Sequence, residues 1–243
     1  MQRYTCGKVC ELNNTGFAGM EPTVRFNCLK TSRIFPFASN VFNLRRMDQT
    51  VLLFTGHLLD NIDRIAARFP YRLITEVGRM IQSEMAQLTD QERPQVAISS
   101  LAAGGDIIFA MEAVRRKIPL HVFLPFETDK FLMDSVKYLK DDPFEDPAEW
   151  ENKFHAVLSA ASSVTTTNPN GPDEDAFTCC NKAMLAFALD HSNHRPAKIL
   201  AIALIQHQSE VKAGGAAEFV NLIESAGIQV KRIWPARSNK LFS

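Results

Sequence analysis

The sequence predicts an α/β protein with a mostly parallel, six-stranded sheet covered by helices on both faces. Three observations support this fold class. After residue 49, short apolar runs alternate with segments whose apolar residues recur at helical spacing. The apolar runs lack polar alternation, which is typical of strands buried on both faces. Right-handed crossovers between parallel strands leave few topologies, and the doubly wound, Rossmann-like order is the commonest of them.

Each expected strand is a short apolar run that stops at a turn signal. The first runs into Thr55-Gly56-His57, and the third ends at Pro125. The fifth is the most apolar of the six, and the fourth is the weakest. The expected strands are Thr50–Phe54, Val96–Leu101, Leu120–Leu124, Ser163–Thr167, Ile199–Ile205 and Ile228–Trp234.

The expected helices follow these strands in alternation. In the first of them, Leu73, Ile74, Val77, Met80 and Ile81 repeat with the period of one helix face. Two others open on paired glycines, and an acidic, proline-bounded link separates the third from the fourth. The expected helices are Tyr71–Leu88, Gly104–Ile118, Asp129–Leu139, Pro147–Ala161, Asp175–His191 and Gly214–Ala226.

Composition excludes several classes of protein. The 243 residues carry 27 Lys+Arg and 27 Asp+Glu, so the chain as a whole is not a basic nucleic-acid-binding protein. The 46% hydrophobic and 22% charged content is that of a globular domain. No apolar run reaches the length of a membrane helix, and Met1–Cys10 lacks the apolar stretch of a signal peptide. We therefore expect a cytoplasmic protein with reduced cysteines, no metal site and no membrane association.

The chain is expected to divide near residue 49. Met1–Asp48 is net +4 and shows no sustained hydrophobic period, which leaves the remainder at −4. A loosely ordered extension is the favoured interpretation of this segment, and a phosphate-seeking arm is the alternative. The expected organisation is therefore an N-terminal extension over 1–48 and one nucleotide-binding domain over 49–243.

The candidate site lies where the carboxyl ends of parallel strands meet, because ligands of such sheets bind where the strand order reverses. Gly104-Gly105-Asp106 follows a strand and opens a helix, so its backbone N–H groups and the helix dipole favour a phosphate. Ser99 and Ser100 add hydroxyl donors. The alternative is a tight turn in which Asp106 only caps its helix. The loop matches neither a P-loop nor a GxGxxG fingerprint.

Other candidates lie in the loops after the first, fourth and fifth strands. Thr55 and Gly56 present a hydroxyl and an N–H group, and His57 offers an imidazole for binding or proton transfer. A solvent-exposed loop histidine is its alternative. Arg68 is a candidate oxyanion ligand, or an ordinary surface arginine.

A helix and a second glycine pair complete the candidate site. Phe177 and Asn181 lie one helical turn apart, which suits stacking on a base and hydrogen bonding to its edge or ribose. A plain core role for Phe177 is the alternative. Gly214 and Gly215 open another helix after the fifth strand. We expect the Thr55, Gly104 and Gly214 loops to converge, and a valine at Gly105 to block the ligand with the fold intact.

In their order and spacing, these motifs resemble the SLOG superfamily, which includes the DNA-processing protein Smf/DprA and the LOG cytokinin-activating hydrolases. The resemblance covers about three-quarters of the chain, from about Val51 to Trp234. The matching stretches are LLFTGHLLD (Leu52–Asp60), RFP (Arg68–Pro70), ISSLAAGGDIIFAMEA (Ile98–Ala113), LHVFLPF (Leu120–Phe126), AFTCCNKAML (Ala176–Leu185), ILAIALI (Ile199–Ile205) and GGAAEFV (Gly214–Val220).

The resemblance implies a pocket for a nucleotide or nucleotide-derived ligand. The chain departs from the LOG hydrolases, whose PGGxGTxxE motif places Thr and Glu where this sequence has Ile108 and Met111. Glu112 falls one position late, so the catalytic glutamate is not reproduced. The resemblance to Smf/DprA does not carry DNA binding over, because the domain is net −4. Phe177 stands where related modules often have tyrosine.

The favoured function is therefore a non-catalytic module that senses a nucleotide-derived small molecule in signalling or defence. No catalytic residue and no cofactor besides that ligand are expected. The alternative is a phosphoribohydrolase or other N-glycosidic-bond enzyme, in which Asp106 or Glu112 stabilises an oxocarbenium-like ribose. A structural or protein-interaction role is a third reading. A homo-oligomer and an effector protein remain open as partners.

Overall fold

A computed structural model describes residues 49–61, 63–87, 94–139, 146–168, 173–194, 197–206 and 211–235. The predicted extension over 1–48 lies outside the described residues, and the first strand begins immediately after it. Among the described residues, none of the helices combines the length and apolar character needed to cross a membrane.

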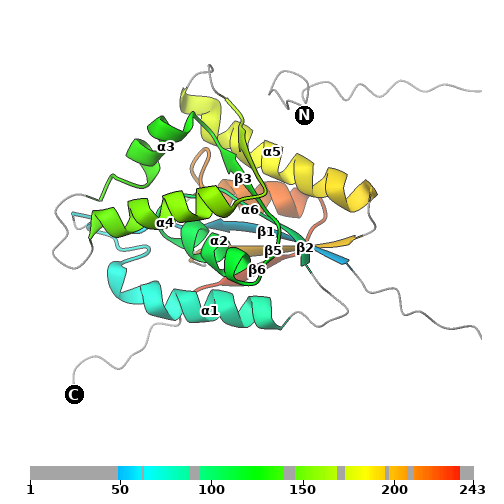
Figure 1. Ribbon diagram of the computed structural model, residues 1–243, viewed down its shortest axis with the longest axis horizontal. Helices are drawn as coiled ribbons and strands as arrows, with labels where there is room; N and C mark the ends of the chain where they lie inside the picture. Colours follow the sequence, from blue (N-terminus) through cyan, green and yellow to red (C-terminus); the bar gives the residue numbers. More distant parts are fainter. Residues whose placement is uncertain are drawn as a thin grey trace, which may run out of the picture.

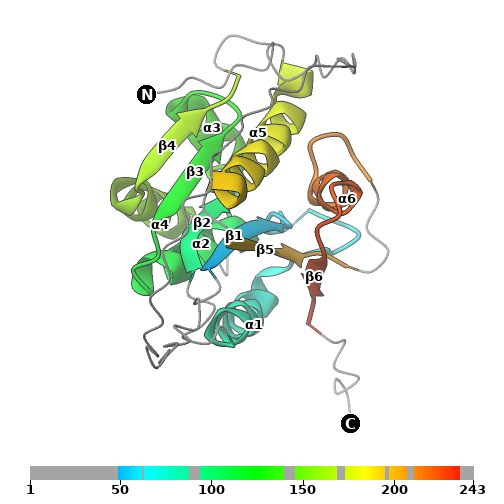
Figure 2. The same cartoon turned by 90° about the vertical axis from the view of Figure 1, so that its right-hand side faces the viewer.

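Six parallel strands form a single sheet in the order β4-β3-β2-β1-β5-β6, which confirms the predicted fold class (Figure 1; β4 is labelled in Figure 2). Every predicted strand is present, with ends shifted by at most a few residues. The strands are β1 (Gln49–Gly56), β2 (Pro94–Ser99), β3 (Leu120–Leu124), β4 (Ser163–Thr166), β5 (Ala197–Leu204) and β6 (Val230–Ile233).

The helices form a layer on each face of the sheet (Figure 2). One layer contains α1 (Ile74–Ala86), α2 (Gly105–Arg115), α3 (Thr128–Ser135) and α4 (Pro147–Ala160), and the other contains α5 (Asp173–His194) and α6 (Ala216–Ser225). A short 3-10 turn, Tyr71–Leu73, precedes α1. Helix α4 begins at an N-cap, because the Asp146 carboxylate accepts the Ala148 N–H at 2.9 Å and Pro147 occupies the first turn.

The two helical layers explain why the strands read as unbroken apolar runs. In β1, Leu52 and Phe54 pack into the core beneath α1–α4, whereas Val51 and Leu53 pack into the core beneath α5 and α6. Successive side chains of a strand point to opposite faces, so both sets of positions must be apolar.

The strand order reverses between β1 and β5. The chain steps outward from β1 to β4 on one side, then returns through α5 to begin β5 on the other side of β1. Right-handed crossovers in opposite directions place the two sets of helices on opposite faces. The strands β1 and β5 stay paired to their carboxyl ends, and a crevice lies beyond those ends, bordered by the first turns of α2 and α6.

Candidate functional site

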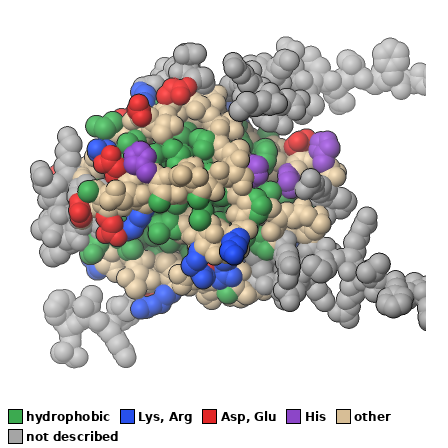
Figure 3. All heavy atoms as spheres, viewed as in Figure 1, with side chains coloured by type: hydrophobic (Ala, Val, Ile, Leu, Met, Phe, Trp, Pro, Cys, Tyr) green, Lys and Arg blue, Asp and Glu red, His purple; other side chains and the backbone are tan. Residues whose placement is uncertain are grey.

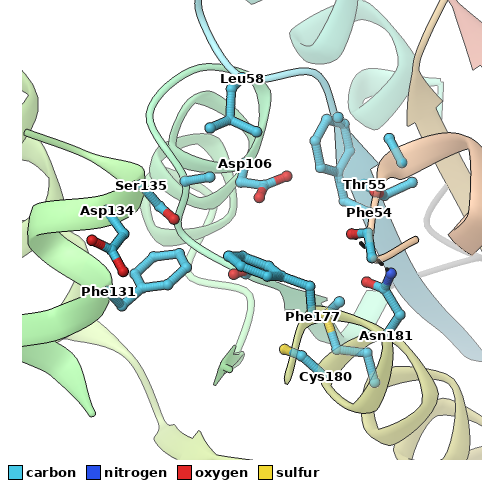
Figure 4. Close-up of a pocket in the computed structure, with 17 residues that line it drawn as sticks. Phe54, Thr55, Leu58, Asp106, Phe131, Asp134, Ser135, Phe177, Cys180 and Asn181 are labelled. Atoms are coloured by element: carbon cyan, nitrogen blue, oxygen red, sulfur yellow. Dashed lines mark hydrogen bonds between the residues drawn. The ribbon is translucent and has the colours of Figure 1, made fainter. Parts of the chain in front are cut away.

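A cavity of about 190 Å³ lies at this reversal point (Figure 4). Its walls come from the ends of β1 and β2 and from α2, α3, α5 and the loop before α6. Among the predicted site residues, those that line it are Thr55, Gly56, Ser100, Asp106, Phe177, Asn181, Gly214 and Gly215. The three predicted loops thus converge. Whether they hold a ligand stays a prediction.

The other predicted site residues are not among those that line the cavity. Ser99 is fully buried, and its hydroxyl has no hydrogen-bond partner among the described residues. Gly104 and Gly105 pack against the loop after β1: Leu58 bridges to Gly104, and the Gly105 N–H donates to the His57 carbonyl at 3.2 Å. These glycines bring two loops into close contact.

Gly105 has little room for a side chain. A Cβ atom there would lie 3.0 Å from Leu204 Cδ2 and 3.3 Å from Gly56 Cα. A valine would press on both neighbours and reduce stability. We therefore expect the substitution to affect stability as well as binding, and the expectation of an intact fold stays a prediction.

Three backbone N–H groups of the candidate phosphate loops have acceptors within the protein. Besides Gly105, the Gly214 N–H donates to Glu218 Oε2 at 2.7 Å, and the Gly215 N–H donates to the Lys212 carbonyl at 3.0 Å. The Glu218 carboxylate also accepts the Thr178 hydroxyl at 3.1 Å. A negative charge in the first turn of α6 offsets the positive end of the helix dipole. A phosphate at α6 would have to displace these contacts.

Asp106 is a buried carboxyl group in the cavity wall. Burial raises its pKa to about 7, although hydrogen bonds from the backbone of Ala102 and Gly56 act in the opposite direction. In Figure 4 its carboxyl group points toward the end of β1 that carries Thr55. The N-cap residue of α2 is Gly104, and no side chain caps that helix. The alternative reading of Asp106 as a plain helix cap is therefore wrong, because it links the loops after β1 and β2.

Phe177 and Asn181 project from the same face of α5. The Phe177 side chain is 38% exposed, and its ring meets Phe126 edge-on with centroids 5.4 Å apart. It is therefore an aromatic surface at the cavity and not a core residue. Asn181 is buried, and its Nδ2 donates to the Gly214 carbonyl at 3.3 Å, which ties α5 to the loop before α6.

His57 and Arg68 contact other segments of the protein and do not line the cavity. Burial, followed by the nearby charges of Arg68 and Arg64, lowers the pKa of His57 to about 4. Its neutral ring accepts the Gln206 N–H at Nε2 (3.4 Å) and contacts Trp234 edge-on. The exposed-histidine alternative is therefore wrong. The Arg68 N–H donates to the Asp60 carboxylate at 2.6 Å, and its carbonyl accepts the Gln206 side-chain amide at 3.3 Å.

Helix α3 contributes residues that the sequence analysis missed. Phe131, Asp134 and Ser135 line the cavity. The Ser135 carbonyl accepts the Ala103 N–H at 2.8 Å, which fixes α3 against the loop after β2. Helix α3 follows β3, and the loop after β3 is not one of the loops from which the site was predicted. The aromatic and carboxylate pair of Phe131 and Asp134, three residues apart on one helix, was the available signal.

Glu112 lies outside the cavity. It lines a separate hollow of about 390 Å³ between α1, α2 and α4, together with Ile108 and Met111. Arg115 Nη2 and Arg116 Nε bind its buried carboxylate at 2.6 and 2.5 Å, and hydrogen bonding from Arg115 lowers its pKa. Figure 3 shows basic side chains gathered on this face, near the end of α2. The helix face that would carry the hydrolase Thr and Glu is thus turned away from the candidate site.

The chain matches no protein-family model and no curated protein. Within the part of the chain that the structure describes, no three His, Cys, Asp or Glu side chains are grouped to hold a metal ion. The fold is a doubly wound, Rossmann-like α/β sheet, and the site defined by the geometry is the cavity at its reversal point.

Proposed function

We propose that this protein binds a nucleotide-derived small molecule in the reversal-point cavity and does not convert it. The exposed ring of Phe177 beside the buried amide of Asn181 carries the proposal, because an aromatic face and an amide recognise a base or a nucleoside. The position of the cavity supports it, since doubly wound sheets bind nucleotides where the strand order reverses. The SLOG resemblance supports it as well, and suggests a sensor in signalling or defence.

The size of the cavity limits what lies inside it. Its volume of about 190 Å³ is below the roughly 300–1,000 Å³ of pockets that enclose drug-sized ligands. It would hold one part of a nucleotide, with the remainder at the mouth beside Phe177. Binding there couples the loops after β1 and β2 with α3, α5 and α6, the segments that would transmit a bound state to a partner.

Binding without turnover agrees with the chemistry of the lining. Cys180 is no nucleophile, because burial raises the pKa of its thiol to about 12. Ile108 and Met111 cannot transfer a proton, and they line the other hollow. Among the described lining residues, Asp106 is the single buried carboxyl group.

We expect nucleosides or nucleotides of at least one base to raise the melting temperature, with a shift that grows logarithmically with concentration above saturation. Mass spectrometry of molecules that co-purify with the protein identifies the base to test first. Phe177→Ala should reduce the shift, because it removes the stacking surface. Tyr71→Ala, another exposed aromatic residue that does not line the cavity, should leave it unchanged. If the ligand raised the melting temperature of both variants equally, the binding site would not be the cavity beside Phe177.

The hydrolase alternative rests on Asp106 alone, since a carboxyl group with a pKa of about 7 can donate a proton near neutrality. We expect no free base after nucleoside monophosphates are incubated for hours with excess protein, as measured by chromatography. Base release that is lost in Asp106→Asn and kept in Glu112→Gln would establish the enzyme. Glu112→Gln is the matched control, because Glu112 lies on the same helix outside the cavity.

A further inference from the structure

The charged side chains in the described lining of the cavity are acidic, and Asp106, whose pKa is about 7, is only partly ionised near neutral pH. Asp106 and Asp134 both line the cavity, and no lysine, arginine or histidine is found among its described lining residues. In the view of Figure 4, Ser135 lies between the two carboxyl groups. Lys130, on the same helix as Asp134, approaches that carboxylate at 3.8 Å and lies over the Phe126 ring at 4.5 Å.

Three glycine N–H groups near the cavity are already used in hydrogen bonds within the protein. The Gly105, Gly214 and Gly215 N–H groups donate to acceptors within the protein, and one of those acceptors is the Glu218 carboxylate. A phosphate group placed here would lie near two carboxyl groups and would have to break these hydrogen bonds to reach the three glycine N–H groups. Phosphate sites usually combine free N–H groups at a helix N-terminus with a nearby cation.

We propose that this cavity recognises the uncharged, donor-rich part of a nucleoside, whose hydroxyl or amino groups face Asp106 and Asp134, and that a phosphate on the ligand weakens binding. This inference rests on the proposed function and names the chemical class of its ligand. Carboxyl oxygens accept hydrogen bonds from ribose hydroxyls and from exocyclic amines. The hydroxyls of Thr55, Ser100 and Ser135 in the lining can donate or accept as the ligand requires.

The discrimination is electrostatic in origin. A phosphate is repelled by the ionised Asp134 carboxylate, and by Asp106 to the extent that Asp106 is ionised. We expect each added phosphate to weaken binding by roughly tenfold, equivalent to about 1.4 kcal/mol. Raising the salt concentration from about 0.05 to 0.5 M should reduce the difference in affinity between a nucleoside and its phosphates, because the mouth of the cavity is open to solvent.

The test is isothermal titration of the full chain with adenosine, guanosine, cytidine and uridine, each beside its 5′-monophosphate and 5′-diphosphate. The expected result is strongest binding by a nucleoside, with weaker binding of its mono- and diphosphate. Tighter binding of a phosphorylated form would overturn the inference and leave the proposed function standing. If no member of any series binds, the proposed function fails and the inference fails with it.

Variants of α3 show whether charge causes the discrimination. Asp134 has a half-exposed side chain, so Asp134→Asn should not disturb the fold. We expect it to improve binding of the monophosphate by roughly two- to fivefold relative to the nucleoside. Asp129→Asn removes an exposed charge from the same helix outside the cavity and should change neither affinity. If the difference in affinity between nucleoside and monophosphate changes neither in Asp134→Asn nor with salt, the phosphate is excluded by lack of space. That result would overturn the electrostatic explanation.

Discussion

Replacing Gly104 with alanine should lower the free energy of unfolding by about 3 kcal/mol or more. Gly104 has φ +122°, a region that L-residues rarely adopt, and such strain costs of order 1–3 kcal/mol. A Cβ atom there would lie 2.7 Å from the Leu59 nitrogen and 2.9 Å from the His57 carbonyl oxygen. Both contacts are backbone atoms, which cannot rotate away. The loop after β1 would have to separate from the start of α2.

Two other glycines provide controls for Gly104→Ala in urea denaturation. Gly227 has φ +77° but nothing within 4 Å of a built Cβ, so Gly227→Ala should cost only about 1–2 kcal/mol of conformational strain. Gly78 lies within α1 and has room for a methyl group, so Gly78→Ala should stabilise by about 0.5–1 kcal/mol. If Gly104→Ala cost no more than Gly227→Ala, the contact between the two loops would not matter for stability.

The strands were predictable because a strand that is buried on both faces appears in the sequence as an unbroken run of apolar residues. Leu120–Leu124 was predicted with its observed ends, since both of its faces meet helices. Helix ends were less accurate, and α5 extends from Asp173 to His194 where a shorter helix was expected. The spacing of apolar residues within a segment does not indicate which strands lie next to each other in the sheet. The order β4-β3-β2-β1-β5-β6, with β5 beside β1, therefore required the structure.

The candidate site was predictable where it depends on strand ends. Thr55, Asp106 and Asn181 reach one cavity because the carboxyl ends of parallel strands share one edge of the sheet. The burial of His57 was not predictable, because its contacts with Trp234 and Gln206 join segments far apart in the sequence. Nor does a glycine pair reveal that its N–H groups are already used, which changes the expected ligand.

The largest pH effect should come from Asp106. Its pKa is about 7 in the folded protein against an ordinary value of 3.8, because burial disfavours the charged form. Between about pH 4 and 7 the unfolded chain ionises this group while the folded protein does not. Stability from Asp106 is therefore full at low pH and is lost as pH rises to about 7, by on the order of 4 kcal/mol in total.

His57 should act in the opposite direction. Its pKa is lowered from 6.5 to about 4, so between those values the unfolded chain takes up a proton that the folded protein refuses. Its contribution is full above about pH 6.5 and is lost as pH falls toward 4, by on the order of 3 kcal/mol. In the wild-type protein the two slopes partly cancel. Asp60, with a raised pKa, and His121, with a lowered one, add smaller terms of each sign.

Single substitutions should separate the two contributions. In Asp106→Asn, stability measured by urea denaturation should rise between pH 4 and 6.5, because His57 alone then acts. In His57→Gln it should fall between pH 4 and 7, because Asp106 alone then acts. At pH 8, Asp106→Asn should be more stable than the wild type by about 2–4 kcal/mol, since the neutral amide avoids the cost of burying a charge. If the free energy of unfolding of both variants depended on pH as it does in the wild type, the pH dependence would come from other groups.

A carboxyl group that costs stability at neutral pH is expected to persist where binding needs it. Asp106→Asn should therefore gain stability at pH 8 and lose most of its nucleoside affinity, because an amide accepts at one oxygen where a carboxylate accepts at two. The two measurements exclude different alternatives. A stabilised variant with undiminished affinity would make Asp106 a link between the loops after β1 and β2 and no part of the binding site. A variant that loses both stability and affinity would show that its contacts with Gly56 and Ala102 outweigh its burial.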